Sequence, residues 1–236
     1  MNWFKRCWLH FKNICTHKWW VFFYSCYFHI PVRGFFHDWS KFTPVEFFES
    51  VKFFKGDSSP INEAKTVNGI SFAWQHHKGR NPHHYEYWTD CYDTGTVARQ
   101  MPWKYVIELV CDYLAAGRTY NDYNMFEKFT FQKELDWWNK VCDEKCMHEE
   151  TKRAVTIILE MLAQHGLRMW TGRNTFGEKD YSTYSRLQTI KDLMFSSYDY
   201  QQKHQNWKKD LVENNMWMGQ KLEPVETEET EKANEQ

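Results

Sequence analysis

Residues 37–44 read HDWSKFTP, and this stretch places two side chains of metal-binding type directly before a helix start. Thr43 is a capping residue type, Pro44 suits the first helical turn, and Glu46 follows Thr43 by three residues, as in a capping box. Apolar side chains then recur at helical spacing until Gly56. The stretch therefore predicts a helix that begins at Pro44 and ends near Gly56.

Apolar spacing typical of helices extends outward on both sides of this stretch. Pro102 opens the clearest pattern, with an apolar stripe from Ile107 to Leu114, while Gly34 is expected to break the chain and Gly166 to cap a helix end. No alternating strand pattern is evident, so the predicted fold class is all-α. The other predicted helices cover residues 3–14, 16–30, 70–77, 82–88, 126–141, 149–165 and 183–213, and the predicted loops cover 56–68 and 90–100.

The composition indicates a globular chain with an unusual aromatic content. Hydrophobic residues make up 42% of the 236 residues and aromatic residues 19%, which predicts an aromatic core, with a base-stacking surface as the alternative. The formal net charge is −1, and the segment 223–236 carries −5 from six Glu and one Lys. The rest of the chain therefore carries about +4 (−1 minus −5), which suits a small phosphate-bearing ligand and does not indicate nucleic acid.

The cysteines and an apolar run near the N-terminus indicate the cellular compartment of the protein. The seven Cys form no Cys-x-x-Cys pair, which favours reduced thiols in a cytoplasmic protein and makes a thiolate zinc site an unattractive interpretation. Residues 19–28 are strongly apolar, yet this run is about half the length that spans a bilayer. We interpret it as a buried helix and expect no membrane partner.

The histidines are concentrated in one part of the chain, with eight of the eleven between residues 10 and 84. Imidazoles beside carboxylates are ligands for Zn²⁺, Mn²⁺ or Fe. Adjacent His37 and Asp38 would diverge by about 100° on a helix and hold an ion between them. Asp112 lies in an apolar helix, where a carboxylate needs a partner; the alternative is a solvated position beside Glu108. We predict His17, His37, Asp38 and Asp112 as metal ligands.

The order His17, His37-Asp38, Asp112 resembles the HD superfamily of metal-dependent phosphohydrolases, an all-α fold named for its adjacent His-Asp pair. Lys41 matches the frequent His-Asp-x-x-Lys extension of that superfamily. HDWSKF and the string HHKGRNPHH at residues 76–84 are similar to those of a narrower family of phage and bacterial proteins without an assigned activity. The resemblance covers residues 13–167. It implies an HD-like helical domain over 1–167. The helical pattern at 183–213 predicts a helical extension over 168–222, and the acidic, apolar-poor composition of 223–236 predicts a disordered tail.

The resemblance also implies a ligand set and its roles. One or two divalent ions are expected, with Mn, Fe, Zn, Ni, Co and Mg all open, and Asp38 and Lys41 are assigned catalytic roles. Not all four histidines at 76–84 can face one ion, because Pro82 interrupts any helix between them, and which of them bind metal stays open. We assign His77 and His84 as further ligands. The predicted substrate contacts are His76, Lys78, Arg80, His83 and Arg118.

These residues lead to three functional hypotheses. The first is hydrolysis of a small-molecule phosphate ester, with a nucleotide as the expected substrate. The second is a diiron oxygenase on the same scaffold, because a histidine-rich set with a bridging carboxylate also suits iron. The third is a phage protein that binds a nucleotide or a host protein without turnover, in the host cytoplasm. Residues 168–222 are open to two roles, a lid over the site or a contact in a homo-oligomer.

Overall fold

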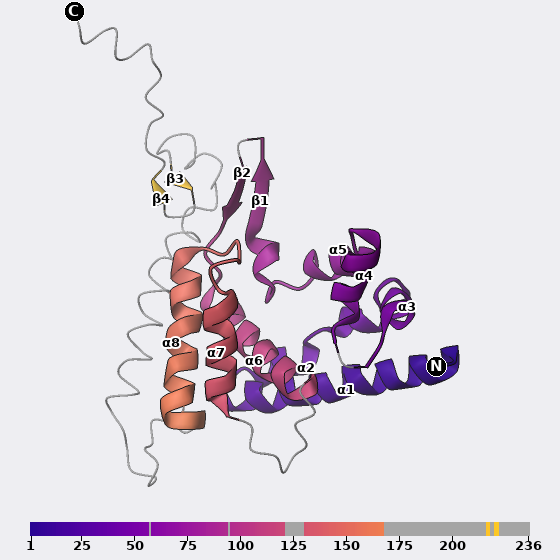
Figure 1. The fold of residues 1–236 in the computed structure, drawn as a ribbon. Helices are drawn as coiled ribbons and strands as arrows, with labels where there is room; N and C mark the ends of the chain where they lie inside the picture. Colours follow the sequence, from indigo (N-terminus) through magenta and orange to yellow (C-terminus); the bar gives the residue numbers. More distant parts are fainter. Residues whose placement is uncertain (57, 94, 121–129, 168–215, 218–219, 222–236) are drawn as a thin grey trace, which may run out of the picture.

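The computed structural model describes residues 1–236 except 57, 94, 121–129, 168–215, 218–219 and 222–236. Within the described residues the chain is mostly helical, which confirms the all-α class (Figure 1). The helices are α1 (Trp3–Tyr27), α2 (Pro31–Phe36), α3 (Pro44–Phe53), α4 (Pro60–Asn68), α5 (Phe72–Lys78), α6 (Trp103–Tyr120), α7 (Phe131–Val141) and α8 (Glu149–His165), with 3-10 turns η1 (Trp39–Phe42) and η2 (Tyr85–Trp88).

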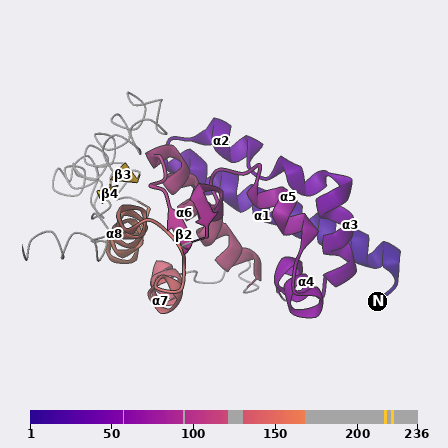
Figure 2. The same cartoon turned by 90° about the horizontal axis from the view of Figure 1, so that it is seen from above.

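Two groups of helices stand on α1. In Figure 1, α6, α7 and α8 lie over its C-terminal part and α3, α4 and α5 over its N-terminal part, and Figure 2 shows the same division from above. The main core belongs to the first group and is formed by side chains with almost no exposure. Its members include Val21, Tyr24, Val106, Leu109, Val110, Leu114, Trp138, Val155, Ile158 and Leu159.

α1 is one continuous helix, so the prediction of separate helices at 3–14 and 16–30 was wrong. Cys15, the single residue between the two predicted helices, does not interrupt a helix as Pro or Gly could, and Asn2 caps the helix by accepting a bond from the Lys5 amide at 2.9 Å. The buried residues His10, Ile14, His17, Val21 and Tyr24 follow at intervals of four, three, four and three. They therefore share one face, which brings His17 into the interior.

Three connections also differ from the prediction. Residues 60–68 form α4, because Pro60 suits its first turn and Gly69, at φ 74°, ends it. Gly34 lies inside α2; a Cβ there would be 2.4 Å from Ser25 Cβ, so glycine permits the close approach of α2 to α1. The predicted loop 90–100 contains a hairpin of β1 (Thr89–Tyr92) and β2 (Gly95–Ala98), whose strands of four residues are too short for a clear alternating pattern.

The later helices agree well with the sequence. α6 begins one residue after Pro102, α8 covers the predicted 149–165, and Gly166 follows it at φ 64°. α7 begins at Phe131, after Thr130 at its N-cap. The predicted start at 126 lies outside the described residues. The predicted helix 183–213 and tail 223–236 also lie outside them. Within 168–222 the structure describes only β3 (Met216–Trp217) and β4 (Gln220–Lys221), which pair antiparallel. None of the described helices is both long and apolar enough to cross a bilayer.

Candidate metal centre

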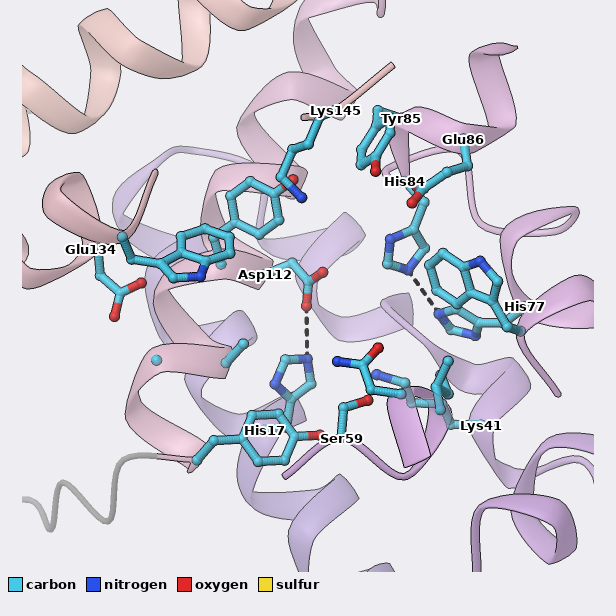
Figure 3. Close-up of a pocket in the computed structure, with 18 of the residues that line it drawn as sticks. His17, Lys41, Ser59, His77, His84, Tyr85, Glu86, Asp112, Glu134 and Lys145 are labelled. Atoms are coloured by element: carbon cyan, nitrogen blue, oxygen red, sulfur yellow. Dashed lines mark hydrogen bonds and ion pairs between the residues drawn. The ribbon is translucent and has the colours of Figure 1, made fainter. Parts of the chain in front are cut away.

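Four buried side chains from three parts of the chain meet between the two groups of helices. His17 comes from α1, Asp112 from α6, and His37 and Asp38 from the connection between α2 and η1. One ligand atom from each lies within 4.8 Å of the others. His17 Nε2 is 2.9 Å from Asp112 Oδ1 (Figure 3), and His37 Nε2 is 3.2 Å from Asp38 Oδ2 and 3.5 Å from Asp112 Oδ1. We call these four residues the first ligand group.

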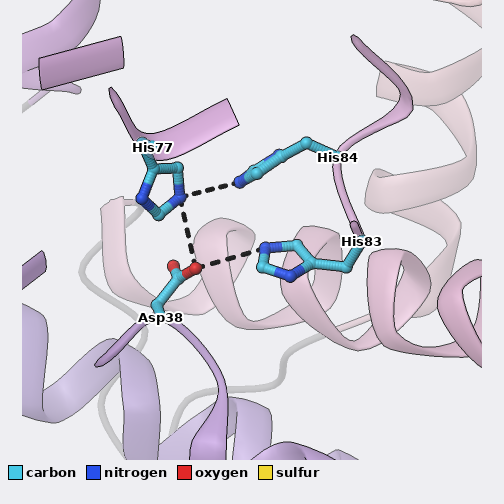
Figure 4. Close-up of side chains that lie close together, drawn as sticks. All are labelled: Asp38, His77, His83 and His84. Carbon is cyan, nitrogen blue, oxygen red and sulfur yellow. Dashed lines mark hydrogen bonds and ion pairs between the residues drawn. The ribbon is translucent and has the colours of Figure 1, made fainter. Parts of the chain in front are cut away.

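A second ligand group consists of Asp38, His77, His83 and His84, whose ligand atoms also lie within 4.8 Å of one another. Asp38 Oδ1 is 3.2 Å from His77 Nε2 and 3.2 Å from His83 Nε2, as Figure 4 shows. His77 Nε2 lies 2.9 Å from His84 Nε2. Two imidazole nitrogens can approach this closely when one carries a proton or when both turn their lone pairs toward a cation.

Asp38 belongs to both groups because its backbone is unusual. α2 ends at Phe36, His37 is extended, and Asp38 adopts the left-handed conformation at φ 53°, which Asp tolerates better than most residues. The prediction that His37 and Asp38 lie on a helix was therefore wrong. The turn directs both side chains inward, each 1% exposed. Oδ1 of Asp38 faces the second group and Oδ2 faces His37, which is the arrangement of a carboxylate that bridges two ions.

The hydrogen bonding of these residues fits a cation. His17 Nε2, His37 Nε2, His83 Nε2 and both carboxylate oxygens of Asp38 are buried without an aligned hydrogen-bond partner. The Lys41 ammonium lies 2.5 Å from Asp38 Oδ2, but the other close contacts bring nitrogen and oxygen ligand atoms together without the angles of hydrogen bonds. Leaving a buried polar group without a hydrogen bond costs about 1–3 kcal/mol. A divalent ion accepts nitrogen and oxygen lone pairs alike, so the donor set fits a metal.

The charges favour ionised carboxylates in both groups. Burial raises the pKa of Asp38, but His37, Lys41, His77 and His83 more than compensate and hold it well below its ordinary value. Burial likewise raises the pKa of Asp112, but its close contacts with His17 and His37 lower it well below its usual range. Both carboxylates are therefore available as anionic ligands at neutral pH.

Four of the ligand imidazoles have shifted pKa values, and the shifts go in two directions. Burial lowers the pKa of His17, with a further contribution from Lys41, and burial together with His83 and His77 lowers that of His84 well below normal. These two rings are neutral, as a metal ligand must be. Burial would also lower the pKa of His37 and His77, but Asp38 and the surrounding carboxylates raise it. A bound cation would take the place of those protons.

Two glutamates hold the outer nitrogens of the ligand histidines. Glu108 Oε1 lies 3.1 Å from His37 Nδ1 and 3.3 Å from His83 Nδ1, and its Oε2 accepts bonds from Arg33 Nε at 2.8 Å and Nη2 at 2.7 Å. Its own pKa is lowered, because bonding to His37 and His83 exceeds the effect of burial. Carboxylates in this position fix the orientation of metal-binding imidazoles.

Glu46 is the second such residue, and the predicted capping box was wrong. Its Oε2 is 2.7 Å from His77 Nδ1 and its Oε1 is 2.6 Å from His76 Nδ1. Thr43 caps no helix amide and instead donates to the Ser40 carbonyl at 2.6 Å. The role of Glu108 could be inferred from the sequence, because it precedes Asp112 by one turn on the same apolar helix. The role of Glu46 could not, because the sequence favoured its assignment to a capping box.

The structure separates the predicted substrate contacts. His83 lies in the second ligand group. His76 bonds to Glu46 and is outside both groups, and Arg80 is exposed and donates to the His76 carbonyl at 3.4 Å. Lys78 is half-buried. Arg118 faces α1, because its Nε donates to Tyr24 Oη at 2.6 Å and its guanidinium lies 4.4 Å from the Trp20 ring centroid. Arg118 is thus engaged with α1, and these contacts do not support its predicted role in substrate binding.

A cavity of about 780 Å³ opens beside the two ligand groups (Figure 3). His17, Asp112, His77, His84 and Lys41 reach it from the ligand side. Lysines and aromatic rings from α4, α5, α6, α7 and the loops around them supply the opposite walls. They are Lys65, Lys133, Lys145, Trp74, Tyr85, Tyr113 and Trp137. The sequence held no signal for these lysines, since isolated Lys residues are usually solvated and only the fold brings them together.

Comparison with known proteins gives one result. No curated protein and no solved structure matches the chain. The family of unknown function DUF5662 matches residues 6–161. The match includes every residue of both ligand groups and both supporting glutamates, and it covers more than half of the sequence. The chain therefore belongs to the DUF5662 family.

Proposed function

We propose that this protein hydrolyses phosphate esters with one or two divalent cations held by the two ligand groups. The observation that carries the proposal is that Asp38 faces both groups while His17, Asp112, His77 and His84 open onto a lysine-lined cavity. A divalent cation supplies a water of lowered pKa and polarises a phosphoryl oxygen. The order of His17, His37-Asp38 and Asp112, which resembles HD-superfamily phosphohydrolases, supports the same chemistry.

Lys41 is the residue to which we assign charge stabilisation. Its Nζ lies 2.5 Å from Asp38 Oδ2 and reaches the cavity. Burial lowers the pKa of Lys41, but Asp38 and Asp112 raise it above its ordinary value. Lys41 therefore stays protonated and serves as a fixed positive charge beside a phosphoryl group, not as a base.

The far side of the cavity suits the rest of an anionic, partly aromatic substrate. Lys65 lies 4.7 Å from the Trp74 ring centroid, and Lys145 lies 5.1 Å from that of Tyr85. Burial leaves the positive charge of both lysines poorly solvated and so lowers their pKa. An anionic ligand would stabilise that charge. Rings beside these cations offer a surface for a base, which makes a nucleotide the substrate class that we favour.

A diiron oxygenase is the second candidate, favoured by the nitrogen-rich composition of the site. The two groups contain five imidazoles and two carboxylates, a set that suits Fe, Mn, Zn, Co or Ni better than Mg. Metal identity and oxygen uptake distinguish the two chemistries.

The test is elemental analysis of protein purified without added metal or chelator, followed by phosphate release from a panel of nucleotides. Asp38→Ala should remove the metal and the activity, because one side chain serves both groups. Asp136→Ala, an exposed carboxylate on α7, is the matched control and should retain both. Metal-loaded wild type that binds nucleotides tightly without releasing phosphate, or turnover that survives Asp38→Ala, would refute the hydrolase assignment.

A further inference from the structure

An exposed aromatic surface covers the outside of α1, the end of α2 and η1; we call it the aromatic face. Phe4, Trp8, Phe11 and Cys15 follow one another at intervals of four, three and four residues, so they form one line along α1. Phe4 is 84% exposed and Trp8 64%. Contiguous apolar surface of this kind on a folded protein usually marks an interaction site.

Ring contacts extend the line from α1 onto the neighbouring segment. Phe11 lies 5.9 Å from Phe42, and Phe42 lies 6.2 Å from Trp39. Trp39 in turn lies 6.1 Å from Phe35 and 6.4 Å from Phe36. Phe35, Phe36 and Trp39 are each more than half exposed. The aromatic face therefore joins two elements and is not a row of unrelated side chains.

The charged residues of α1 and α2, which carry most of the aromatic face, are all basic. Residues 1–37 contain no Asp or Glu and five Lys or Arg, of which Arg33 is paired with Glu108. Lys5 and Lys12 are exposed and precede the exposed Trp19 at seven-residue intervals, so they flank the aromatic line. Lys18 Nζ lies 5.3 Å from the Trp39 ring centroid. The surface thus combines Trp and Phe rings with positive charge.

We propose that the aromatic face docks on the surface of an anionic phospholipid membrane. Trp and Phe rings enter the boundary between headgroups and acyl chains, and flanking lysines meet anionic headgroups. The apolar run at residues 19–28 is too short to span a bilayer, but docking at a surface needs no spanning segment. The proposal stands on surface residues alone and is independent of the proposed hydrolase.

Two other occupants fit these observations less well. A second copy of the chain would place two positively charged surfaces against each other, which is unfavourable. Single-stranded nucleic acid is bound in a basic groove that follows the strand, whereas these rings lie along the outside of one helix and the segment next to it. An anionic bilayer satisfies both the rings and the lysines.

The residues of α1 are better test positions than those of the loop. Phe36 and Trp39 point outward, but His37 and Asp38 between them belong to the first ligand group. Changes in that loop would disturb both surfaces. Phe4 and Trp8 are remote from the ligand residues in sequence and highly exposed, so their replacement should leave the fold intact.

The experiment measures co-sedimentation of the full chain with vesicles of phosphatidylcholine alone or mixed with phosphatidylglycerol. We expect binding to the mixed vesicles that weakens as salt is added. Phe4→Ser with Trp8→Ser should weaken it at least about tenfold, from the apolar area lost to the bilayer. Lys5→Gln with Lys12→Gln should weaken it about fivefold per charge. Phe72→Ser, a 69% exposed phenylalanine on α5, is the matched control and should bind as the wild type does.

Several results would overturn the proposal. These are absence of binding to mixed vesicles, equal binding to both kinds of vesicle, or equal loss in Phe72→Ser and in the α1 variants, with circular dichroism confirming that each variant is folded. A dimer that Phe4→Ser with Trp8→Ser dissociates, without vesicle binding, would assign the face to a second copy. Binding of a single-stranded oligonucleotide that these substitutions abolish, again without vesicle binding, would assign it to nucleic acid.

Discussion

The two ligand groups share Asp38 but differ in how the fold supports them. The first group takes His17 from α1 and Asp112 from α6, the two long helices that pack against each other in the main core. The second group takes its histidines from α5, a helix of seven residues, and from the loop before η2. Rigid elements hold ligands more precisely than loops do, so His17 and Asp112, the two ligands that are specific to the long helices, make the first group the better preorganised, although His37 and Asp38 come from a connection.

Their charges differ in the same direction. The first group contains two carboxylates and two imidazoles, and the second contains one carboxylate and three imidazoles. Two negative charges beside one ion bind a divalent cation more strongly than one does. We therefore expect two ions of unequal affinity, with the tighter ion in the first group. This difference can be tested by changing one group at a time.

The largest effect is expected from Asp112→Asn. Asp112 is a ligand of the first group alone, and the amide removes one of the two negative charges there while keeping the shape. We expect loss of the tighter ion and at least a thousandfold fall in kcat, because an essential metal ligand is lost. Metal titration and phosphate-release kinetics measure both quantities. Asp136→Asn is the control, and near-normal turnover by Asp112→Asn would contradict the assignment of the first group.

His84→Ala should break only the second group. Its burial is less complete than that of the other ligands, so the fold should tolerate the truncation. We expect the metal content to fall by about one equivalent while the tighter ion remains, since His17, His37, Asp38 and Asp112 are unchanged. Gln75→Ala, at an exposed position of α5 outside both groups, is the matched control. Loss of both ions in His84→Ala would show that the two groups form a single site.

Substitution of the supporting glutamates should have smaller effects on metal affinity, and these effects should differ between the two ligand groups. Glu108 contacts His37 of the first group and His83 of the second, whereas His77 is the one ligand histidine that Glu46 contacts. Losing such a contact usually weakens metal binding about 10- to 100-fold. Glu108→Gln should therefore weaken both ions, and Glu46→Gln the weaker ion alone. Competition with a chelator measures the two affinities, and equal effects of the two substitutions on both ions would contradict this arrangement.

Sequence patterns predicted the long elements and the first group better than the second. Helical spacing and cap residues located α6 and α8, because propensity and packing agree there. His17 and Asp112 could be selected as chemically unexpected residues of apolar helices. The sequence could not show which histidines at 76–84 are ligands, because this depends on where a short helix and a loop lie in space. The left-handed turn at Asp38 was equally hidden, because an isolated His-Asp pair carries no sign of its backbone conformation.

Two buried carboxyls that line the same cavity, those of Asp112 and Glu134, have pKa shifts in opposite directions. Asp112 has a lowered pKa because histidines surround it, while burial alone raises the pKa of Glu134 to about 7. Glu134 lies against Gly117, where a Cβ would stand 1.7 Å from its Oε1, and it belongs to neither ligand group. Burial without imidazole neighbours thus favours the neutral carboxyl of Glu134, whereas burial among imidazoles favours the ionised carboxylate of Asp112.

The pH dependence of stability tests this contrast. Below about pH 4.5 Glu134 is protonated in both the folded and the unfolded chain and contributes nothing. As pH rises toward 7, the unfolded chain loses this proton while the folded chain keeps it, so the free energy of unfolding falls. Glu134→Gln should therefore raise the free energy of unfolding by about 2 kcal/mol at pH 8 and by less than about 1 kcal/mol at pH 5. Urea denaturation at both pH values measures the change. Metal content should stay at the wild-type level, and a Glu134→Gln protein that is destabilised at pH 8 would mean that the carboxylate has a cationic partner in the cavity.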